Sequence, residues 1–173
     1  MDIAMKMLTV AVLSLVAVPL TAQTGAVAGM SAIYGAARGN LVKSAEMMPE
    51  ENYSFQATPE VRSFGQIIGH VANANFMFCS LALGEKSPNS TDFEKTTDKA
   101  GLVKGIKDSF AYCDKAYAIS DANGLMSADL FGMKTNRIGV LSFNSGHDME
   151  HYGNIVTYFR LKGMVPPSSQ RGM

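Results

Sequence analysis

The sequence predicts an all-α protein, an up-and-down antiparallel four-helix bundle. Four segments carry apolar residues at steps of three and four, the spacing that places them on one face of a helix. Pro and Gly stand where several of these segments end, and no segment alternates apolar and polar residues as a half-buried strand does. At 173 residues the chain has the length of one domain, and four amphipathic helices are typical of a bundle.

Residues 1–22 have the layout of a secretory signal peptide. Lys6 belongs to a short n-region, and a continuous apolar run follows it. Cleavage after Ala22 fits the small residues there, and a second pattern allows cleavage as late as Ala28. An uncleaved anchor or a core helix is the alternative, but the run is shorter than the roughly 20 residues that cross a membrane. We therefore predict an exported protein, periplasmic or extracellular, with no stable membrane insertion after cleavage and a bundle domain over residues 28–173.

The first helix of the domain is predicted from about Ala28 to Met48. Pro49 ends it, because proline has no amide hydrogen with which to continue the helical ladder. Apolar residues recur at three- and four-residue steps on the face that we expect to be buried: Met30, Ile33, Tyr34, Ala37, Leu41, Ala45 and Met48.

The second helix is predicted to open at Ser63 and to stop at Gly84. Ser63 and Gln66 have the spacing of a capping box, in which each side chain bonds to the backbone amide of the other residue. Gly84 is a natural stop, since glycine adopts the left-handed conformation without strain. The expected buried stripe is Phe64, Ile67, Ile68, Val71, Ala74, Phe78 and Leu81.

The third and fourth helices are predicted over about residues 98–120 and 138–162. A break at residues 121–124 ends the third helix, and Gly163 ends the fourth. Residues 125–137 are ambiguous and fit a loop with one turn of helix. The stripe of the third helix is Leu102, Val103, Ile106, Phe110, Cys113 and Tyr117.

The formal net charge of the chain is zero, with 15 basic and 15 acidic residues and no basic run. A protein that binds nucleic acid needs a basic patch to neutralise phosphates, so we expect no nucleic acid partner. Attraction of a polybasic segment to an anionic membrane is equally unsupported.

Cys79 and Cys113 are the two cysteines of the chain, too few for a disulfide framework. An exported protein can hold a single bridge between neighbouring helices, and two small buried hydrophobes are the alternative. We favour unbridged cysteines, because the sequence does not show that the two Cβ atoms approach each other.

The candidate functional site consists of the three histidines of the chain. His147 and His151 are four residues apart on the fourth helix, so their rings point to the same side, one turn apart. His70 lies in the middle of the second helix. The residues that share the sides of the three rings are mainly apolar: Ala74, Met77, Leu81, Val140, Phe143, Ile155 and Tyr158. Three inward imidazoles without partners would be costly, and one shared cation explains them together.

Three histidine ligands that leave a position open are typical of a catalytic zinc site rather than of a closed structural one. We expect one divalent metal ion, Zn²⁺, with Ni²⁺ or Mn²⁺ as alternatives. The zinc-protease pattern H-E-x-x-H is not present, because Asp148 and Met149 follow His147. A bundle with three hydrogen-bonded histidines and no metal is the other interpretation.

Two stretches of the chain carry a resemblance to a known family. Residues 45–75 read AEMMPEENYSFQATPEVRSFGQIIGHVANAN, with Pro-Glu after the first helix, Arg-Ser-Phe-Gly where the second begins, and a histidine within it. Residues 147–169 read HDMEHYGNIVTYFRLKGMVPPSS, with His-x-x-x-His, a following glycine, Arg-x-x-Gly and Pro-Pro. With the order of the helices, these features make the chain similar to the DinB/YfiT-like metalloenzymes, over nearly all of its mature length.

The resemblance implies a metal bound by one histidine of the second helix and two of the fourth, which are His70, His147 and His151 here. It also implies a metal-dependent transferase or hydrolase, because some relatives are thiol-dependent transferases or isomerases in which a low-molecular-weight thiol binds the metal. The implied partners are a small-molecule substrate, such a thiol, and a second copy of the chain in a homodimer. Tyr152 and Asn154 stand where the family often has Arg and Gln.

The metal would lower the pKa of a bound water toward about 7 or ionise a bound thiol for attack on an electrophile. The polar residues on or beside the histidine faces are candidates to line the pocket: Asn73, Asn144, Asn154 and Glu150. A non-catalytic exported metal-binding or carrier bundle is the alternative function. The twelve methionines suggest copper for such a carrier, but several fall on core stripes, where filling gaps is the simpler role.

Overall fold

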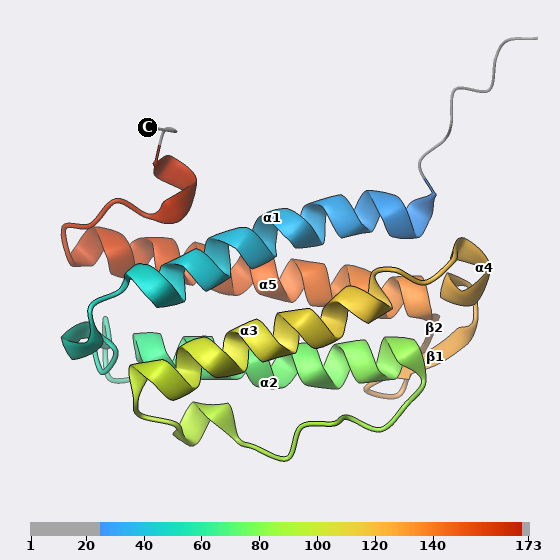
Figure 1. Ribbon diagram of the computed structural model, residues 1–173, viewed down its shortest axis with the longest axis horizontal. Helices are drawn as coiled ribbons and strands as arrows, with labels where there is room; N and C mark the ends of the chain where they lie inside the picture. Colours follow the sequence, from blue (N-terminus) through green and yellow to red (C-terminus); the bar gives the residue numbers. More distant parts are fainter. Residues whose placement is uncertain (1–24, 171–173) are drawn as a thin grey trace, which may run out of the picture.

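The computed structural model describes residues 25–170, so the predicted signal peptide over residues 1–22 lies outside the described residues. Four long helices form the predicted bundle (Figure 1). They are α1 (Ala26–Met47), α2 (Phe64–Leu83), α3 (Lys99–Ala116) and α5 (Arg137–Leu161). Short 3₁₀ turns lie in the connections: η1 (Glu50–Asn52), η2 (Phe93–Lys95) and η3 (Pro167–Ser169). Within residues 25–170, no helix has the length and apolar character needed to cross a membrane.

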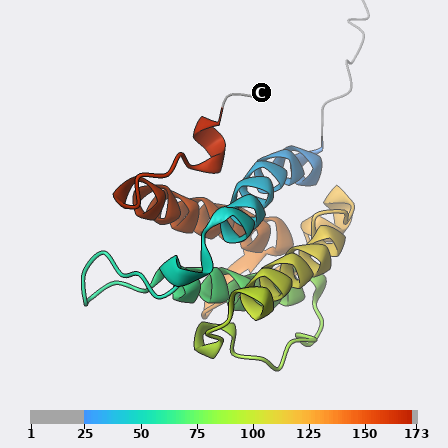
Figure 2. The same ribbon diagram turned by 60° about the vertical axis from the view of Figure 1, so that its left-hand side comes forward.

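Each of the four long helices packs against two neighbouring helices of the bundle. α2 packs against α3 and α5, and α1 packs against the same two helices from the other side (Figure 2). α1 is antiparallel to α3, and α2 is antiparallel to α5 (Figure 1). α2 and α3 run in the same direction, because the connection over residues 84–98 returns along the bundle before α3 begins. The all-α bundle is confirmed, and its helices run up, down, down and up in chain order.

Local capping explains where the helices begin and end. The Ser63 hydroxyl accepts a hydrogen bond from the Gln66 amide (3.2 Å), and Gln66 Oε1 accepts one from the Ser63 amide (2.9 Å), which confirms the capping box. Gly84 ends α2 with a φ of 73°, as predicted. Asp98 caps α3 by accepting a bond of 2.7 Å from the Gly101 amide. Each such N-cap contributes about 1 kcal/mol to stability.

The core lies between the four helices and is built from their apolar stripes. Its fully buried large side chains come from every long helix and include Leu41, Ile68, Phe64, Leu102, Phe110, Leu141 and Phe159. Four side chains that were expected to face inward are exposed instead: Ile33, Met77, Leu81 and Phe143. They lie on sides of α1, α2 and α5 that the neighbouring helices leave partly uncovered.

A short β-hairpin occupies the segment where a loop with one helical turn was expected. α4 (Asp121–Gly124) is a short helix at the predicted break after the third helix, and β1 (Ser127–Leu130) then pairs antiparallel with β2 (Met133–Asn136). Phe131 and Gly132 join the strands with φ values of 55° and 83°, and two positive φ values suit the twist of a two-residue hairpin turn. The sequence did not reveal these strands, because four residues with little alternation of burial give no periodic signal.

Cys79 of α2 and Cys113 of α3 form a disulfide, and their Cα atoms are 5.2 Å apart. The expectation of two unbridged cysteines was therefore wrong. The two residues are 34 positions apart in the sequence, and the parallel packing of α2 and α3 brings them to the same level of the bundle. This contact depends on the course of the long connection, which the periodicity of the helices does not encode.

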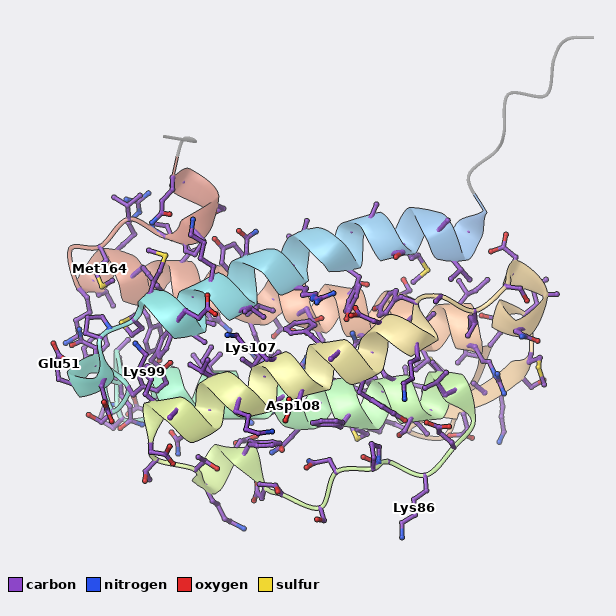
Figure 3. All side chains as sticks on the ribbon, in the orientation of Figure 1. Glu51, Lys86, Lys99, Lys107, Asp108 and Met164 are labelled. Carbon is purple, nitrogen blue, oxygen red and sulfur yellow. A yellow bond between two sulfur atoms is a disulfide. The ribbon has the colours of Figure 1, made fainter. Side chains whose placement is uncertain are left out.

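Polar contacts join α1 to α3 on the outside of the bundle. Lys107, labelled in Figure 3, places its Nζ 2.6 Å from Glu46 Oε1. Lys99, also labelled there, donates a hydrogen bond of 2.8 Å to the Met48 carbonyl just after α1. Exposed ion pairs such as the first contribute at most about 1 kcal/mol, so the stability of the bundle rests on its core.

Candidate metal centre

The three histidines predicted as metal ligands meet between α2 and α5. His70 comes from α2, and His147 and His151 come from successive turns of α5, which packs against α2. His147 Nε2 lies 3.1 Å from His70 Nε2 and 3.1 Å from His151 Nε2. One nitrogen atom of each ring lies within 4.8 Å of the other two. The structure therefore brings together all three residues that the sequence singled out.

These separations fit ligands of a single cation. Zn–N bonds of about 2.0–2.1 Å hold two nitrogen atoms 3.1 Å apart when the angle at the metal is about 95–100°. Hydrogen bonds can also span 3.1 Å, but a neutral imidazole has one N–H, and Nε2 of His147 faces two other nitrogen atoms at once. A cation satisfies the three lone pairs together, so this set of donors suits a divalent metal.

Burial keeps two of the rings neutral, which is the state that binds a metal. Desolvation first, and the nearby His151 and His70 second, lower the pKa of His147 to about 3. Desolvation, followed by the effect of His70, lowers the pKa of His151 to about 4. At neutral pH a metal therefore does not compete with a proton for these two lone pairs.

The metal-free protein is expected to lose stability as the pH falls from 6.5, the ordinary histidine pKa, toward 4. In this range unfolded histidines bind protons, whereas His147 and His151 in the folded protein do not, so acid favours the unfolded chain. Asp148 acts in the opposite direction, because burial raises its pKa well above normal and the folded protein therefore holds this proton more tightly than the unfolded chain does. Because two histidines take up protons on unfolding and one carboxyl opposes them, we expect a net uptake of protons and a loss of stability in this range.

Urea denaturation of chelator-treated protein at several pH values measures this slope. The Asp148→Asn variant is the matched control, because it removes the opposing carboxyl and should make the loss of stability steeper. A free energy of unfolding that stays constant from pH 6.5 to pH 4 in both proteins would contradict the lowered pKa values of the two histidines.

Glu94 of η2 contacts His70 and was not predicted from the sequence. Glu94 Oε1 lies 2.5 Å from Nδ1 of His70, and Glu94 Oε2 accepts a hydrogen bond of 3.2 Å from Nε of Arg62. The His70 and Glu94 side chains are 24% and 31% exposed, so water reaches their contact only in part. Glu94 stands 24 positions after His70 in a polar connection, and no motif marks it.

Three of the four predicted pocket residues lie near the cluster, in different roles. Asn154 Nδ2 is 3.5 Å from Nδ1 of His151. Asn73 holds η2 in place, since its Oδ1 accepts a hydrogen bond of 3.1 Å from the Phe93 amide. Glu150 is exposed and lines a cavity beside the cluster.

The fourth predicted pocket residue, Asn144, points into the core instead. It is fully buried and donates hydrogen bonds to the Tyr117 hydroxyl (3.2 Å) and to Asp148 Oδ2 (3.3 Å). Asp148 Oδ1 has no hydrogen-bond partner within the described part of the chain. Burial raises the pKa of Asp148 well above its ordinary value, and its Oδ2 bonds to Asn144 in the core.

A cavity of about 660 Å³ adjoins the cluster at His151. Its walls come from α5, from the connection that precedes α2 and from the first turn of α2, and they combine charged, polar and apolar groups. They include Val61, Arg62, Ile67, Glu150, Asn154 and Thr157. Because His151 belongs to both the cluster and the cavity wall, a small molecule in the cavity would lie beside a candidate metal ligand.

Several solved structures share the fold of this chain. A DinB-like protein from Bacillus cereus superposes with a TM-score of 0.71 at 17% identity, over 80% of this chain and 94% of that chain. A DinB-like protein from Bacillus subtilis superposes with a TM-score of 0.63 at 19% identity, over 83% of this chain and 99% of that chain. A mycothiol-dependent maleylpyruvate isomerase gives 0.64 at 14% identity, and the match covers 75% of this chain and 60% of that enzyme. At these identities the likeness shows the fold alone. No curated protein sequence matches the chain.

A family model extends this likeness from fold to sequence. The model of the DinB superfamily matches residues 33–155, which is more than half of the chain and includes all three histidines. The match agrees with the family resemblance of the sequence and with the DinB-like solved structures. The chain therefore belongs to the DinB superfamily.

Proposed function

We propose that this protein is a metal-dependent enzyme that acts on a small molecule through a site of His70, His147 and His151. The observation that carries the proposal is the convergence of three Nε2 atoms, with His147 3.1 Å from each of the other two. The cation would be Zn²⁺, because neutral imidazoles and an open position suit it, with Ni²⁺ or Mn²⁺ as alternatives. The reaction would be a group transfer or a hydrolysis.

A bound cation would supply Lewis acidity, which makes a thiolate or a hydroxide available as nucleophile near neutral pH. The residues of the chain would hold the reactants in place. Three histidine ligands leave the charge of the cation uncompensated, and Arg62 pairs with the Glu94 carboxylate, so the site would favour an anionic nucleophile. The thiol-dependent isomerase with the same fold supports a low-molecular-weight thiol as one reactant.

The second reactant would bind in the cavity beside His151. Arg62 and Asn154 offer hydrogen-bond donors on its wall, and Ile67 offers an apolar surface. Arg62 is oriented there by the bond from its Nε to Glu94, which leaves the other guanidinium nitrogen atoms for a ligand. A small electrophile with both apolar and polar groups would fit such a wall.

We also propose that the protein is exported. The disulfide between Cys79 and Cys113 supports this proposal, because disulfides persist in oxidising compartments and are rare in the reducing cytosol. A homodimer is proposed from the family resemblance alone.

Cleavage of the signal peptide after Ala22 is favoured over cleavage after Ala28. The first residues of α1 are part of the fold: the amides of Ala26 and Val27 each donate a hydrogen bond of 3.0 Å to the carboxylate of Asp121. Cleavage after Ala28 would remove both donors, so the shorter signal peptide suits the domain better.

Turnover of a panel of electrophiles, with low-molecular-weight thiols or with water, tests the enzyme proposal. We expect turnover by protein loaded with Zn²⁺, Ni²⁺ or Mn²⁺, its loss after chelation, and its return when the metal is restored. Met149→Ala is the matched control, because Met149 is exposed on α5 between the two histidines and should not affect the rate. Protein that binds metal but turns over none of the panel would contradict catalysis and would favour a metal carrier.

A further inference from the structure

We propose that Glu94 is a positioning residue, which orients the His70 ring so that its Nε2 faces the metal. This inference rests on the proposed metal site. The Glu94 carboxylate accepts a hydrogen bond from Nδ1 of His70, which fixes the ring proton on that nitrogen. The lone pair then remains on Nε2, the atom that lies 3.1 Å from Nε2 of His147.

Both oxygen atoms of the Glu94 carboxylate are engaged. Oε1 lies 2.5 Å from His70 Nδ1, and Oε2 accepts a hydrogen bond of 3.2 Å from Arg62 Nε. The backbone of Arg62 is itself anchored, because its carbonyl accepts a hydrogen bond of 2.5 Å from the Tyr158 hydroxyl. A carboxylate held at both oxygens has a defined orientation, and the ring that bonds to it acquires one as well.

The η2 turn that carries Glu94 is packed closely between α2 and α3. A Cβ atom at Gly69 of α2 would overlap the carbonyl of Phe93, and one at Gly105 of α3 would overlap the Phe93 ring. Asn73 of α2 adds a hydrogen bond of 3.1 Å to the Phe93 amide. The close approach at Gly69 and Gly105 and the hydrogen bond with Asn73 therefore hold the η2 turn in place beside His70.

The three histidines differ in what their second ring nitrogen contacts. Nδ1 of His147 is buried and has no hydrogen-bond partner among residues 25–170. Nδ1 of His151 has only Asn154 near it, at 3.5 Å, which is the limit of a hydrogen bond. His70 alone among the three has a carboxylate partner in the described residues. It is also the one ligand that comes from α2, so α5 does not set its orientation.

Glu94→Ala is expected to weaken Zn²⁺ binding by about 10–100-fold, the usual effect of removing a residue that orients a metal ligand. Competition with a chromophoric chelator measures the affinity. Glu94→Gln retains an acceptor oxygen and should restore part of the loss. Lys95→Ala is the matched control, because Lys95 is an exposed residue of the same turn and should not affect binding. If Glu94→Ala bound Zn²⁺ as tightly as the wild type, the inference would be overturned.

A measurement on metal-free protein separates the orientation of the ring from an effect on folding. Long-range ¹H–¹⁵N spectra at alkaline pH report which nitrogen of His70 carries the proton. We expect Nδ1–H in the wild type and Nε2–H in the Glu94→Ala variant. Nε2–H in the wild type, or the same tautomer in both proteins, would overturn the inference. Wild-type protein that binds no metal would instead refute the proposed function, and these spectra would still test the role of Glu94.

Discussion

Replacing His147 with Gln is expected to abolish stoichiometric Zn²⁺ binding. Nε2 of His147 stands 3.1 Å from Nε2 of both other rings, so the substitution removes the nitrogen atom that His70 and His151 share as a neighbour. A structural zinc site with four ligands has a binding free energy of about 10–16 kcal/mol. An equal share for each ligand is about 2.5–4 kcal/mol, so the loss of one ligand should lower the affinity roughly 10²–10³-fold. Elemental analysis and chelator competition measure the effect.

The same substitution should leave the fold intact. Nδ1 of His147 is buried and makes no hydrogen bond to any described residue, so the fold loses no hydrogen bond at that atom. We expect the variant to keep the helical circular dichroism of the wild type. Met149→Ala on the same helix should bind Zn²⁺ normally. A His147→Gln protein with normal zinc content would show that the three rings are not the site.

Removing the disulfide, by Cys79→Ala and Cys113→Ala together, is expected to lower the free energy of unfolding by about 2–4 kcal/mol. The bridge joins residues 34 positions apart, and most of its effect is the entropy that it removes from the unfolded chain. For a domain of this size, the midpoint of thermal unfolding should fall by roughly 5–15 °C.

Urea denaturation with and without a strong reductant provides the control for the disulfide. The wild type should approach the stability of the double variant when reductant is present, whereas the double variant should not respond to it. Equal stability of the two proteins in the absence of reductant would mean that the bridge contributes nothing to the free energy of unfolding.

The helices could be predicted from the sequence because each of them carries its own signals. The Ser63–Gln66 capping box and the stop at Gly84 are local features, and the structure places both as expected. The parallel packing of α2 and α3 could not be predicted, because it depends on where the connection over residues 84–98 runs. The disulfide was missed for the same reason, since it forms only when these two helices lie side by side in that direction.

In the candidate site, too, the residues marked by local sequence signals could be predicted, whereas those that depend on tertiary packing could not. His147 and His151 could be predicted from their spacing on one helix, and His70 from its place within the second helix. Glu94 could not be predicted, because its contact with His70 depends on the packing of η2 against α2 and α3. Asn144 was misplaced because it lies four residues before Asp148, and these two residues share the side of α5 that faces the core.

Anomalous-difference density from crystals of the zinc-loaded protein, recorded at the zinc absorption edge, tests the metal centre most directly. We predict one peak between α2 and α5, about 2.0–2.1 Å from Nε2 of His70, His147 and His151. The absence of a peak between these rings in folded protein, or a zinc ion bound through other side chains, would contradict the metal centre.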